Sequence, residues 1–307
     1  MKRIILAGGK GFLGQALAKQ FCEGGSEVVI LTRSPRGRAD GVKELSWDGK
    51  SLGAWAQLMD GANAVINLTG RSVDCRYTAA NRRVIVASRV DSTRVLGEAI
   101  ARCAKPPQVW LNASSATIYK HTYTTPMDEK GAMGATPETK DDFSVEVIRQ
   151  WERALDEART PTTRKIALRI TMVFGAGGGV FPVLRRLARF GLGGRMGSGE
   201  QFVSWIHITD FLQAVEWLLA QDDFSGPVNL AAPQPLPNAE MMQLMREAVG
   251  MPIGLPATAW MLEVGAVLLR TETELILKSR RVVPGRLLAA GFQFQFSEMG
   301  AALRDLA

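Results

Sequence analysis

The chain has 307 residues, of which 46% are hydrophobic and 22% charged, and its formal net charge is +7. This composition is typical of a globular protein and excludes a disordered or fibrous chain. The three cysteines, Cys22, Cys75 and Cys103, are an odd number and form no closely spaced pair. We therefore expect no disulfide framework and no metal site, and we expect a reducing, cytoplasmic location.

The basic residues are scattered in small groups and do not form a patch with interleaved aromatic residues. We therefore interpret the positive charge as a solvated surface and expect no nucleic-acid partner. The longest apolar stretch, residues 259–269, is interrupted by Glu263 and is shorter than the roughly 20 residues of a membrane span. The expected partner is thus a small-molecule substrate, with no membrane.

Short apolar runs alternate with amphipathic stretches along the first two-thirds of the chain. The pattern predicts buried strands at Ile4–Ala7, Val28–Leu31, Ala64–Leu68, Val109–Asn112 and Ile166–Ile170, and helices at Phe12–Glu23, Asn81–Cys103 and Phe143–Ala158. This alternation is typical of βαβ units. The predicted fold is α/β, a doubly wound parallel sheet of the Rossmann type that binds its ligand at the carboxyl ends of the strands.

After residue 174 the chain changes to glycine-rich loops and helices punctuated by proline. A helix at Ile208–Leu219 and a strand at Val228–Leu230 then return to the earlier pattern. We therefore predict a Rossmann domain of residues 1–174 plus 206–232. The remaining residues, 175–205 plus 233–307, are expected to form a smaller, mostly helical lobe over the open end of the sheet.

Directly after the first strand the chain reads Gly8-Gly9-Lys10-Gly11-Phe12-Leu13-Gly14. In a GxxGxxG loop, Gly8 permits a tight turn, Gly11 lets the backbone approach a pyrophosphate, and Gly14 lets the helix pack closely on the strand. Because the loop follows a strand and opens a helix, it predicts a dinucleotide site. The alternative is a plain glycine turn.

The second strand ends at Thr32-Arg33-Ser34, where a site for NAD has an acidic residue on the ribose. Arg33 instead suits the 2′-phosphate of NADP, and the hydroxyl of Ser34 can donate to it. We therefore predict NADP(H) as the cofactor. A solvated loop arginine is the alternative interpretation of Arg33.

Together these motifs resemble the extended short-chain dehydrogenase/reductases. The resemblance continues in the segments 67–70 (Asn-Leu-Thr-Gly), 114–119 (Ser-Ser-Ala-Thr-Ile-Tyr), 169–175 (Arg-Ile-Thr-Met-Val-Phe-Gly) and 205–210 (Trp-Ile-His-Ile-Thr-Asp). A narrower set of segments resembles the epimerase-family proteins that carry a C-terminal domain of unknown function, beginning here near Asn238. These segments are 47–48, 88–90, 142–152, 191–199 and 287–292.

The resemblance implies an NADP-dependent oxidoreductase or epimerase and leaves its substrate open, with a sugar nucleotide or another carbonyl or hydroxyl compound as the expectation. Carried over by position, the cofactor residues are Gly8, Gly11, Phe12, Leu13, Gly14, Thr32, Arg33, Ser34, Leu68, Thr69, Gly70, Arg89 and Val173, with Arg83 a weaker candidate. The active-site serine maps onto Ser115.

The Tyr-x-x-x-Lys pair of short-chain dehydrogenases is missing. In that pair the lysine lowers the pKa of the tyrosine, and one helical turn places both on one face. Two frames fit the expected position: Phe143 with Val147, and Ser144 with Ile148. Neither frame contains the pair, so a proton donor, if there is one, is non-standard.

Tyr119, Tyr123, His121 and Glu146 are the candidate substitutes, and each is also open to a structural or surface interpretation. His207 and Asp210 are expected to be structural residues at a helix start. Two functions remain open: an NADP(H)-dependent enzyme that uses Ser115, and a non-catalytic NADP-binding sensor or partner-binding protein. The long helices from Asn81 and Phe143 form a dimer face in many related enzymes, so a homodimer is the expected assembly, with a monomer as the alternative.

Overall fold

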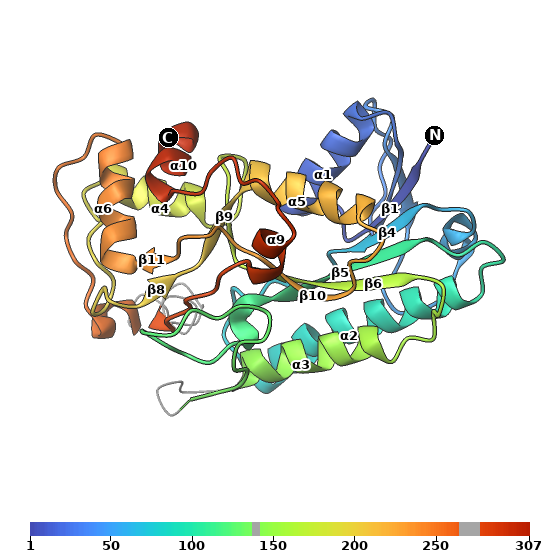
Figure 1. Ribbon diagram of the computed structural model, residues 1–307, viewed down its shortest axis with the longest axis horizontal. Helices are drawn as coiled ribbons and strands as arrows, with labels where there is room; N and C mark the ends of the chain where they lie inside the picture. The colour runs from blue at the N-terminus through green and yellow to red at the C-terminus, as the bar shows by residue number, and fades with distance from the viewer. Residues whose placement is uncertain (137–141, 264–276) are drawn as a thin grey trace.

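The computed structural model describes residues 1–136, 142–263 and 277–307, and its largest element is a seven-stranded parallel sheet (Figure 1). The strand order is β10-β6-β5-β4-β1-β2-β3. The strands are β1 (Arg3–Ala7), β2 (Glu27–Thr32), β3 (Lys43–Ser46), β4 (Ala64–Asn67), β5 (Val109–Ser115), β6 (Arg164–Ile170) and β10 (Gly226–Leu230). The order reverses beside β1, as in a doubly wound sheet, and this confirms the expected fold class.

Helices cover both faces of the sheet, because successive strand residues are all apolar and point in turn to opposite faces. Ile4 and Leu6 belong to one buried cluster, whereas Ile5 and Ala7 belong to another. Helices α1 (Phe12–Glu23) and α5 (Ile208–Ala220) cover the first face, and α2 (Ala79–Ala101) and α3 (Phe143–Asp156) cover the second (Figure 1). The sheet is therefore the middle of three layers.

A third buried cluster lies beyond the carboxyl edge of the sheet and includes Phe174, Phe181 and Trp205. It is enclosed by α4 (Phe181–Arg189), α6 (Asn238–Ala248), α10 (Met299–Leu306) and four short strands, β7 (Met172–Phe174), β8 (Phe202–Val203), β9 (Trp205–His207) and β11 (Leu236–Pro237). The rings of Phe174 and Trp205 stack 6.2 Å apart. The exact division into two domains stays a prediction, although the separate cluster is consistent with it.

The elements differ from the sequence prediction mainly at their ends. Helix α2 begins at Ala79, two residues before the predicted start, because the side chain of Thr78 accepts a hydrogen bond from the backbone of Asn81 and caps the helix. Strand β3 was not predicted, because its residues Lys43–Ser46 are largely polar and form the edge of the sheet. Short helices not predicted are η1 (Ala54–Met59), η2 (Ala116–Ile118) and α9 (Gly285–Ala289).

His207 and Asp210 are structural residues at the start of α5. The Nδ1 atom of His207 accepts a hydrogen bond from the backbone of Thr209. Asp210 is fully buried, and its carboxylate accepts hydrogen bonds from the backbone of Gln295 and Phe296, so it holds the C-terminal segment against α5. Within the described ranges, no helix is both long and apolar enough to cross a membrane.

Candidate functional site

Two cavities follow the carboxyl edge of the sheet. The first, of about 660 Å³, is lined by the glycine loop after β1, the ends of β2 and β4, and the start of α2. The second, of about 650 Å³, is lined by the ends of β5 and β6 and by residues of the C-terminal lobe. The segment from Arg71 to Asp74 borders both, because Arg71 and Ser72 line the first and Asp74 lines the second.

Asn67, the last residue of β4, fixes the floor of the first cavity. Its side chain is fully buried and donates to Oδ1 of Asn112 on β5 at 2.7 Å and to Oγ1 of Thr93 on α2 at 3.3 Å. Its own Oδ1 accepts from the backbone of Thr69 at 3.0 Å. The loop after β4 is thus held in place by a buried polar network.

The glycine loop closes on this floor. Gly8 has a φ of +73°, and a Cβ there would lie 2.8 Å from Cα of Thr69, so only glycine fits. A Cβ on Gly14 would lie 2.5 Å from Cα of Gly9. Gly11 differs from both, because a Cβ there would meet nothing within 4 Å and its φ is −76°. The fold itself does not require glycine at position 11, and the open space there can accommodate a ligand.

Two features suit a dinucleotide: Thr69 lines this cavity, and Arg89 lies behind its lining, next to Gly70. The Oγ1 atom of Thr69 is buried without a hydrogen-bond partner among the described residues, so it can take one from a bound water or ligand. Burial lowers the pKa of Arg89 to about 10. Its guanidinium contacts no carboxylate in the described part of the chain, donates to the carbonyls of Arg71 and Ile85, and lies 5.0 Å over the ring of Trp151.

The charge of the cavity is strongly positive. Its lining includes Lys10, Arg33, Lys50, Arg71 and Arg83, and Asp48 is the one acidic residue among the described lining residues. A concave surface with this balance attracts anions. The lining also contains the expected residues Gly8, Gly11, Thr32, Arg33, Leu68, Thr69 and Gly70.

Arg33 is the arginine after β2 that both lines the cavity and remains available. Arg38 forms ion pairs with Asp40 and Glu44, and Nζ of Lys10 donates to the carbonyl of Ser34 at 2.7 Å and to Glu44 at 3.1 Å. Lys10 is exposed, but its ammonium group is therefore engaged beside the end of β2. Arg33 is exposed and forms no ion pair or hydrogen bond within the described ranges.

Several expected cofactor residues support the cavity without lining it. Phe12 packs on the glycine-rich loop after β7, where a Cβ on Gly175 would lie 2.6 Å from its ring and a Cβ on Gly178 would lie 3.0 Å away. Leu13 packs against the core of the sheet, and Val173 is buried in that core. The loop at 175–179 is thus rich in glycine because Phe12 occupies the space above it.

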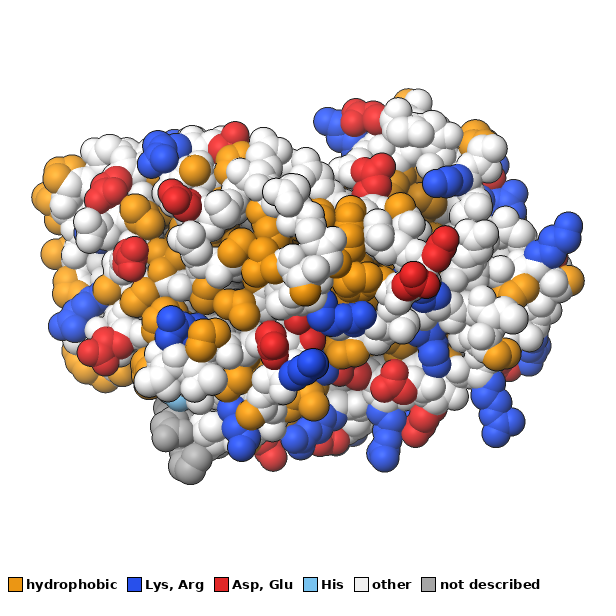
Figure 2. All heavy atoms as spheres, in the orientation of Figure 1, with side chains coloured by type: hydrophobic (Ala, Val, Ile, Leu, Met, Phe, Trp, Pro, Cys, Tyr) orange, Lys and Arg blue, Asp and Glu red, His pale blue; other side chains and the backbone are white. Residues whose placement is uncertain are grey.

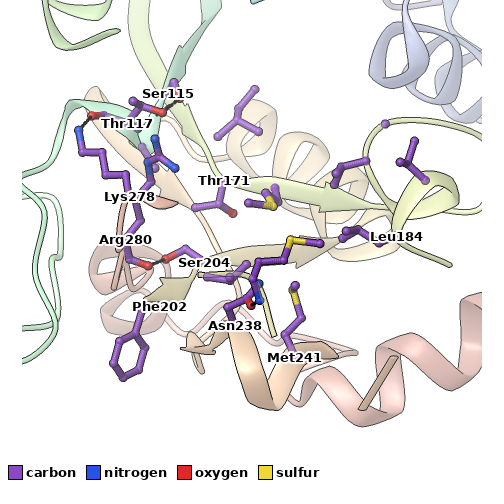
Figure 3. Close-up of a pocket in the computed structure, with 18 of the residues that line it drawn as sticks. Ser115, Thr117, Thr171, Leu184, Phe202, Ser204, Asn238, Met241, Lys278 and Arg280 are labelled. Carbon is purple, nitrogen blue, oxygen red and sulfur yellow. Dashed lines mark hydrogen bonds between the residues drawn. The ribbon is translucent and has the colours of Figure 1, made fainter. Parts of the chain in front are cut away.

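Ser115, the last residue of β5, lines the second cavity. Its hydroxyl donates to Oγ1 of Thr117 at 3.0 Å and accepts from the backbone of Thr117 at 3.2 Å. Figure 3 shows Ser115 at one end of the cavity, with Thr171 facing into it and Met241 and Leu184 farther away. A serine hydroxyl can rotate, so Ser115 can donate to a ligand oxygen in place of Thr117.

The two frames of the missing dyad are filled by packed side chains. Phe143 and Val147 lie in a buried cluster with Ile85, and the ring of Phe143 contacts that of Tyr77 at 5.0 Å. In the other frame, Ser144 is only 9% exposed and Ile148 lies in a second buried cluster. An apolar wall therefore replaces the tyrosine and lysine.

The candidate substitute acids do not line either cavity. Tyr119 is fully buried, where its hydroxyl donates to Asn229 and accepts from Arg169, and burial raises its pKa. Glu146 is exposed and accepts from Gln150.

The other two candidates lie on the lobe side of Tyr119. The rings of His121 and Tyr123 pack against each other with centroids 4.9 Å apart, and Nδ1 of His121 accepts from the backbone of Ser279. Tyr123 is 44% exposed. The structure thus brings only Ser115, among the expected chemical groups, to a cavity.

Lys278 and Arg280 line the second cavity and were not identified from the sequence. They lie about 160 positions after Ser115 in a segment with no recognisable motif, so only the folded chain brings them to this place. The signal available in the sequence was the pair of basic residues at 280–281, which was interpreted as surface charge.

Comparison with known proteins gives two family matches. The model of the NAD dependent epimerase/dehydratase family matches residues 4–231, and a domain of unknown function (DUF1731) matches residues 257–306. The second match begins later than the start near Asn238 that the resemblance suggested.

Three individual proteins illustrate the similarity. The epimerase family protein SDR39U1 of Bos taurus is 32% identical, covering 99% of both chains. The crystal structure of human SDR39U1 (isoform 2) with NADPH has a TM-score of 0.86 at 31% identity, covering 99% of both chains. A nucleoside-diphosphate sugar epimerase from Corynebacterium glutamicum has a TM-score of 0.79 at 27% identity, covering 99% of this chain and 58% of that one.

The contrast between Gly11 and Gly14 can be tested by two matched substitutions. Gly11→Ala places a methyl group in open space, so it should lower stability by less than about 1 kcal/mol and weaken dinucleotide binding at least tenfold. Gly14→Ala places a methyl group against backbone, so it should lower stability by about 2–3 kcal/mol. Urea unfolding and calorimetric titration measure both effects. Equal dinucleotide affinity in wild type and Gly11→Ala would contradict the assignment.

Proposed function

The chain belongs to the NAD dependent epimerase/dehydratase family, and on that premise we propose that it binds NADP(H) and exchanges hydride with a carbonyl or hydroxyl carbon held beside Ser115. The observation that carries this proposal is the first cavity. It combines an unpaired buried hydroxyl at Thr69, open space over Gly11 and an excess of cations. These are the features that a pyrophosphate and its ribose require.

NADP(H) is favoured over NAD(H) by the end of β2. A 2′-phosphate needs a cation there, and Arg33 is exposed and uncommitted while Arg38 is held by Asp40 and Glu44. The similar human protein was crystallised with NADPH, which supports the same choice. Thr69 would donate a hydrogen bond to the adenosine half of the cofactor or accept one from it. Arg89, from its buried position, would offset the negative charge of the cofactor phosphates.

Ser115 is the residue proposed to hold the substrate oxygen. When bound, NADPH supplies the hydride, and NADP+ remains. Ser115 would donate its hydroxyl hydrogen bond to the carbonyl oxygen and orient the carbon that accepts the hydride. The oxygen takes one proton, so that a carbonyl compound, NADPH and a proton become an alcohol and NADP+. The reverse direction oxidises a hydroxyl carbon by the same exchange.

The missing dyad limits this chemistry. Phe143 and Val147 contribute neither a proton nor a positive charge, and Tyr119, Tyr123, His121 and Glu146 do not line the cavity. General acid catalysis is worth about 10²–10⁴-fold. We therefore infer slow turnover of simple carbonyl compounds, with the proton taken from solvent, from the substrate itself or from another group at the cavity wall.

The second candidate function is an NADP-binding sensor or partner-binding protein without turnover. It is favoured by the apolar packing at both dyad frames, which leaves the expected catalytic helix without a reactive group. The open cavity at Ser115 favours the enzyme, because a sensor has no need of about 650 Å³ beside the active-site serine.

The cofactor preference is tested by calorimetric titration of wild type and Arg33→Asp with NADPH and with NADH. Wild type should bind NADPH more tightly. Because the aspartate repels the 2′-phosphate and accepts from a free ribose hydroxyl, Arg33→Asp should weaken NADPH binding about 10–100-fold and strengthen NADH binding. Arg36→Asp, three residues away and outside the cavity, is the control and should preserve the preference. Equal affinity of wild type for both cofactors would rule out the role of Arg33.

Catalysis is tested by NADPH oxidation against a library of aldehydes, ketones and sugar nucleotides. Wild type should show a turnover number about 10²–10⁴-fold below that of an enzyme with the full dyad. Ser115→Ala should lower this activity about 10²-fold further, with NADPH affinity unchanged. If wild type and Ser115→Ala are equally inactive on the whole library, the sensor function replaces the enzyme.

A further inference from the structure

The wall of the second cavity is mainly apolar. Met172 follows the end of β6, Leu184 comes from α4 and Met241 from α6, and Met196 and Phe202 complete this part of the lining. In Figure 3, Leu184, Phe202 and Met241 lie on the side of the cavity away from Ser115. A wall of methionine and leucine binds hydrocarbon and offers few partners to a sugar hydroxyl.

Two cations interrupt this apolar wall at the opposite end. Lys278 is 5% exposed, and its Nζ donates to the carbonyl of Thr117 at 3.1 Å. Arg280 is half-buried, and its carbonyl accepts from Ser204, which anchors the backbone of the segment beside the cavity. Figure 3 shows both side chains extending toward Ser115 and Thr117.

The cationic end and the reactive end are the same end. The hydroxyl of Ser115 is hydrogen-bonded to the hydroxyl and the backbone nitrogen of Thr117, and Nζ of Lys278 donates a hydrogen bond to the carbonyl of the same residue. A group that accepts from Lys278 therefore lies within a few bonds of a group that accepts from Ser115. Asp74 is the one acidic residue among the described lining residues of the cavity, and it is exposed to solvent.

We propose that this cavity binds an amphipathic anion, a molecule with an apolar body and one carboxylate or phosphate group that Lys278 and Arg280 hold next to Ser115. The anionic group is recognised by an ammonium and a guanidinium, which is the usual pairing for carboxylate and phosphate. The apolar body extends toward Met196 and Met241. A sugar nucleotide is disfavoured because its hydroxyl groups would meet an apolar wall without hydrogen-bond partners.

The assignment of this amphipathic anion as the substrate rests on the proposed function. If the chain exchanges hydride at Ser115, the reacting carbon is close to the anionic group, and the substrate is an oxo or hydroxy acid or phosphate with an apolar tail. The balance is that of the proposed reaction: hydride from NADPH to the carbonyl carbon, one proton to its oxygen. Binding of the anion itself requires no turnover and can be tested alone.

The test is calorimetric titration of the full chain, with and without NADP+, using three probes with the same eight-carbon tail. Octanoate and octyl phosphate carry the two kinds of anion, and 1-octanol carries none. At least one anion should bind ten times more tightly than 1-octanol, and the stronger of the two identifies the natural head group. If 1-octanol binds as tightly as both anions, or if no probe binds, the proposal fails.

Variants then locate the anion. Lys278→Met and Arg280→Met should each lower the affinity for the preferred anion at least tenfold and leave the affinity for 1-octanol unchanged. The control is Arg281→Met, the neighbouring cation, which does not line the cavity: its guanidinium donates to the carbonyl of Thr124 and lies 4.6 Å from the ring centroid of Phe202. This variant should keep the preference for the anion over 1-octanol. Arg280→Lys keeps the charge and should retain most of the affinity, which covers the case in which a methionine variant does not fold. Unchanged anion affinity in folded Lys278→Met and Arg280→Met would overturn the assignment.

These results are separate from those for hydride transfer. Anion binding without NADPH oxidation would support the anion site and contradict the proposed enzyme activity. NADPH oxidation with neutral carbonyl compounds, without anion binding, would support the enzyme activity and contradict the anion site. If both hold, 2-oxooctanoate should be reduced faster than 2-octanone, and Lys278→Met should abolish that difference.

Discussion

The buried side chain of Asn67 is the constraint on which the candidate site depends. An amide in the middle of a parallel sheet must have its hydrogen bonds satisfied, and Asn67 satisfies them by joining β4 to β5 and α2 and by holding the backbone of Thr69. With Thr69 fixed, Gly8, whose φ is +73°, must remain without a side chain. The position of the glycine loop, and so the shape of the first cavity, follows from this one network.

The same edge of the sheet connects the first cavity to the second. Asn67 on β4 pairs in register with Asn112 on β5, and Ser115 lies three residues farther along β5. The C-terminal lobe then closes the second cavity with α4, α6 and the segment that carries Lys278 and Arg280. Figure 2 shows hydrophobic side chains gathered over the lobe side of the molecule and many Lys and Arg side chains along the lower and right-hand margins, over the sheet and its helices. An anion site inside the apolar lobe is therefore distinct from the general basic surface.

Local patterns were enough to predict six strands of the sheet and the glycine loop of the first cavity. Buried runs such as Ile4–Ala7 give the strands, because a parallel strand buried on both faces is continuously apolar. The spacing of Gly8, Gly11 and Gly14 predicts the glycine loop, and the cation at position 33 predicts the preference for NADP(H). Each of these signals is local: a strand is one short run, and Gly8 and Arg33 are 25 positions apart, which is why the sequence alone reveals them.

The second cavity could not be predicted in the same way. Its walls come from segments such as Met172, Phe202 and Lys278, which have no local motif and meet only through the short sheets and the packing of the lobe. Edge strand β3 was missed for a related reason, since its polar residues resemble a loop. The candidate acids Tyr119 and His121 were named because they follow Ser115 in sequence, yet the chain turns at η2 and directs them into the core and toward the C-terminal segment.

The central claim is that the network at Asn67 prepares the Thr69 hydroxyl for a dinucleotide, and the most direct measurement is the NADPH affinity and the unfolding free energy of Thr69→Val. Because the hydroxyl is buried without a partner in the free protein, its removal should leave stability unchanged or raise it by up to about 1–3 kcal/mol. The lost hydrogen bond should weaken NADPH binding about tenfold. A variant that is less stable than wild type but binds NADPH equally well would contradict this account.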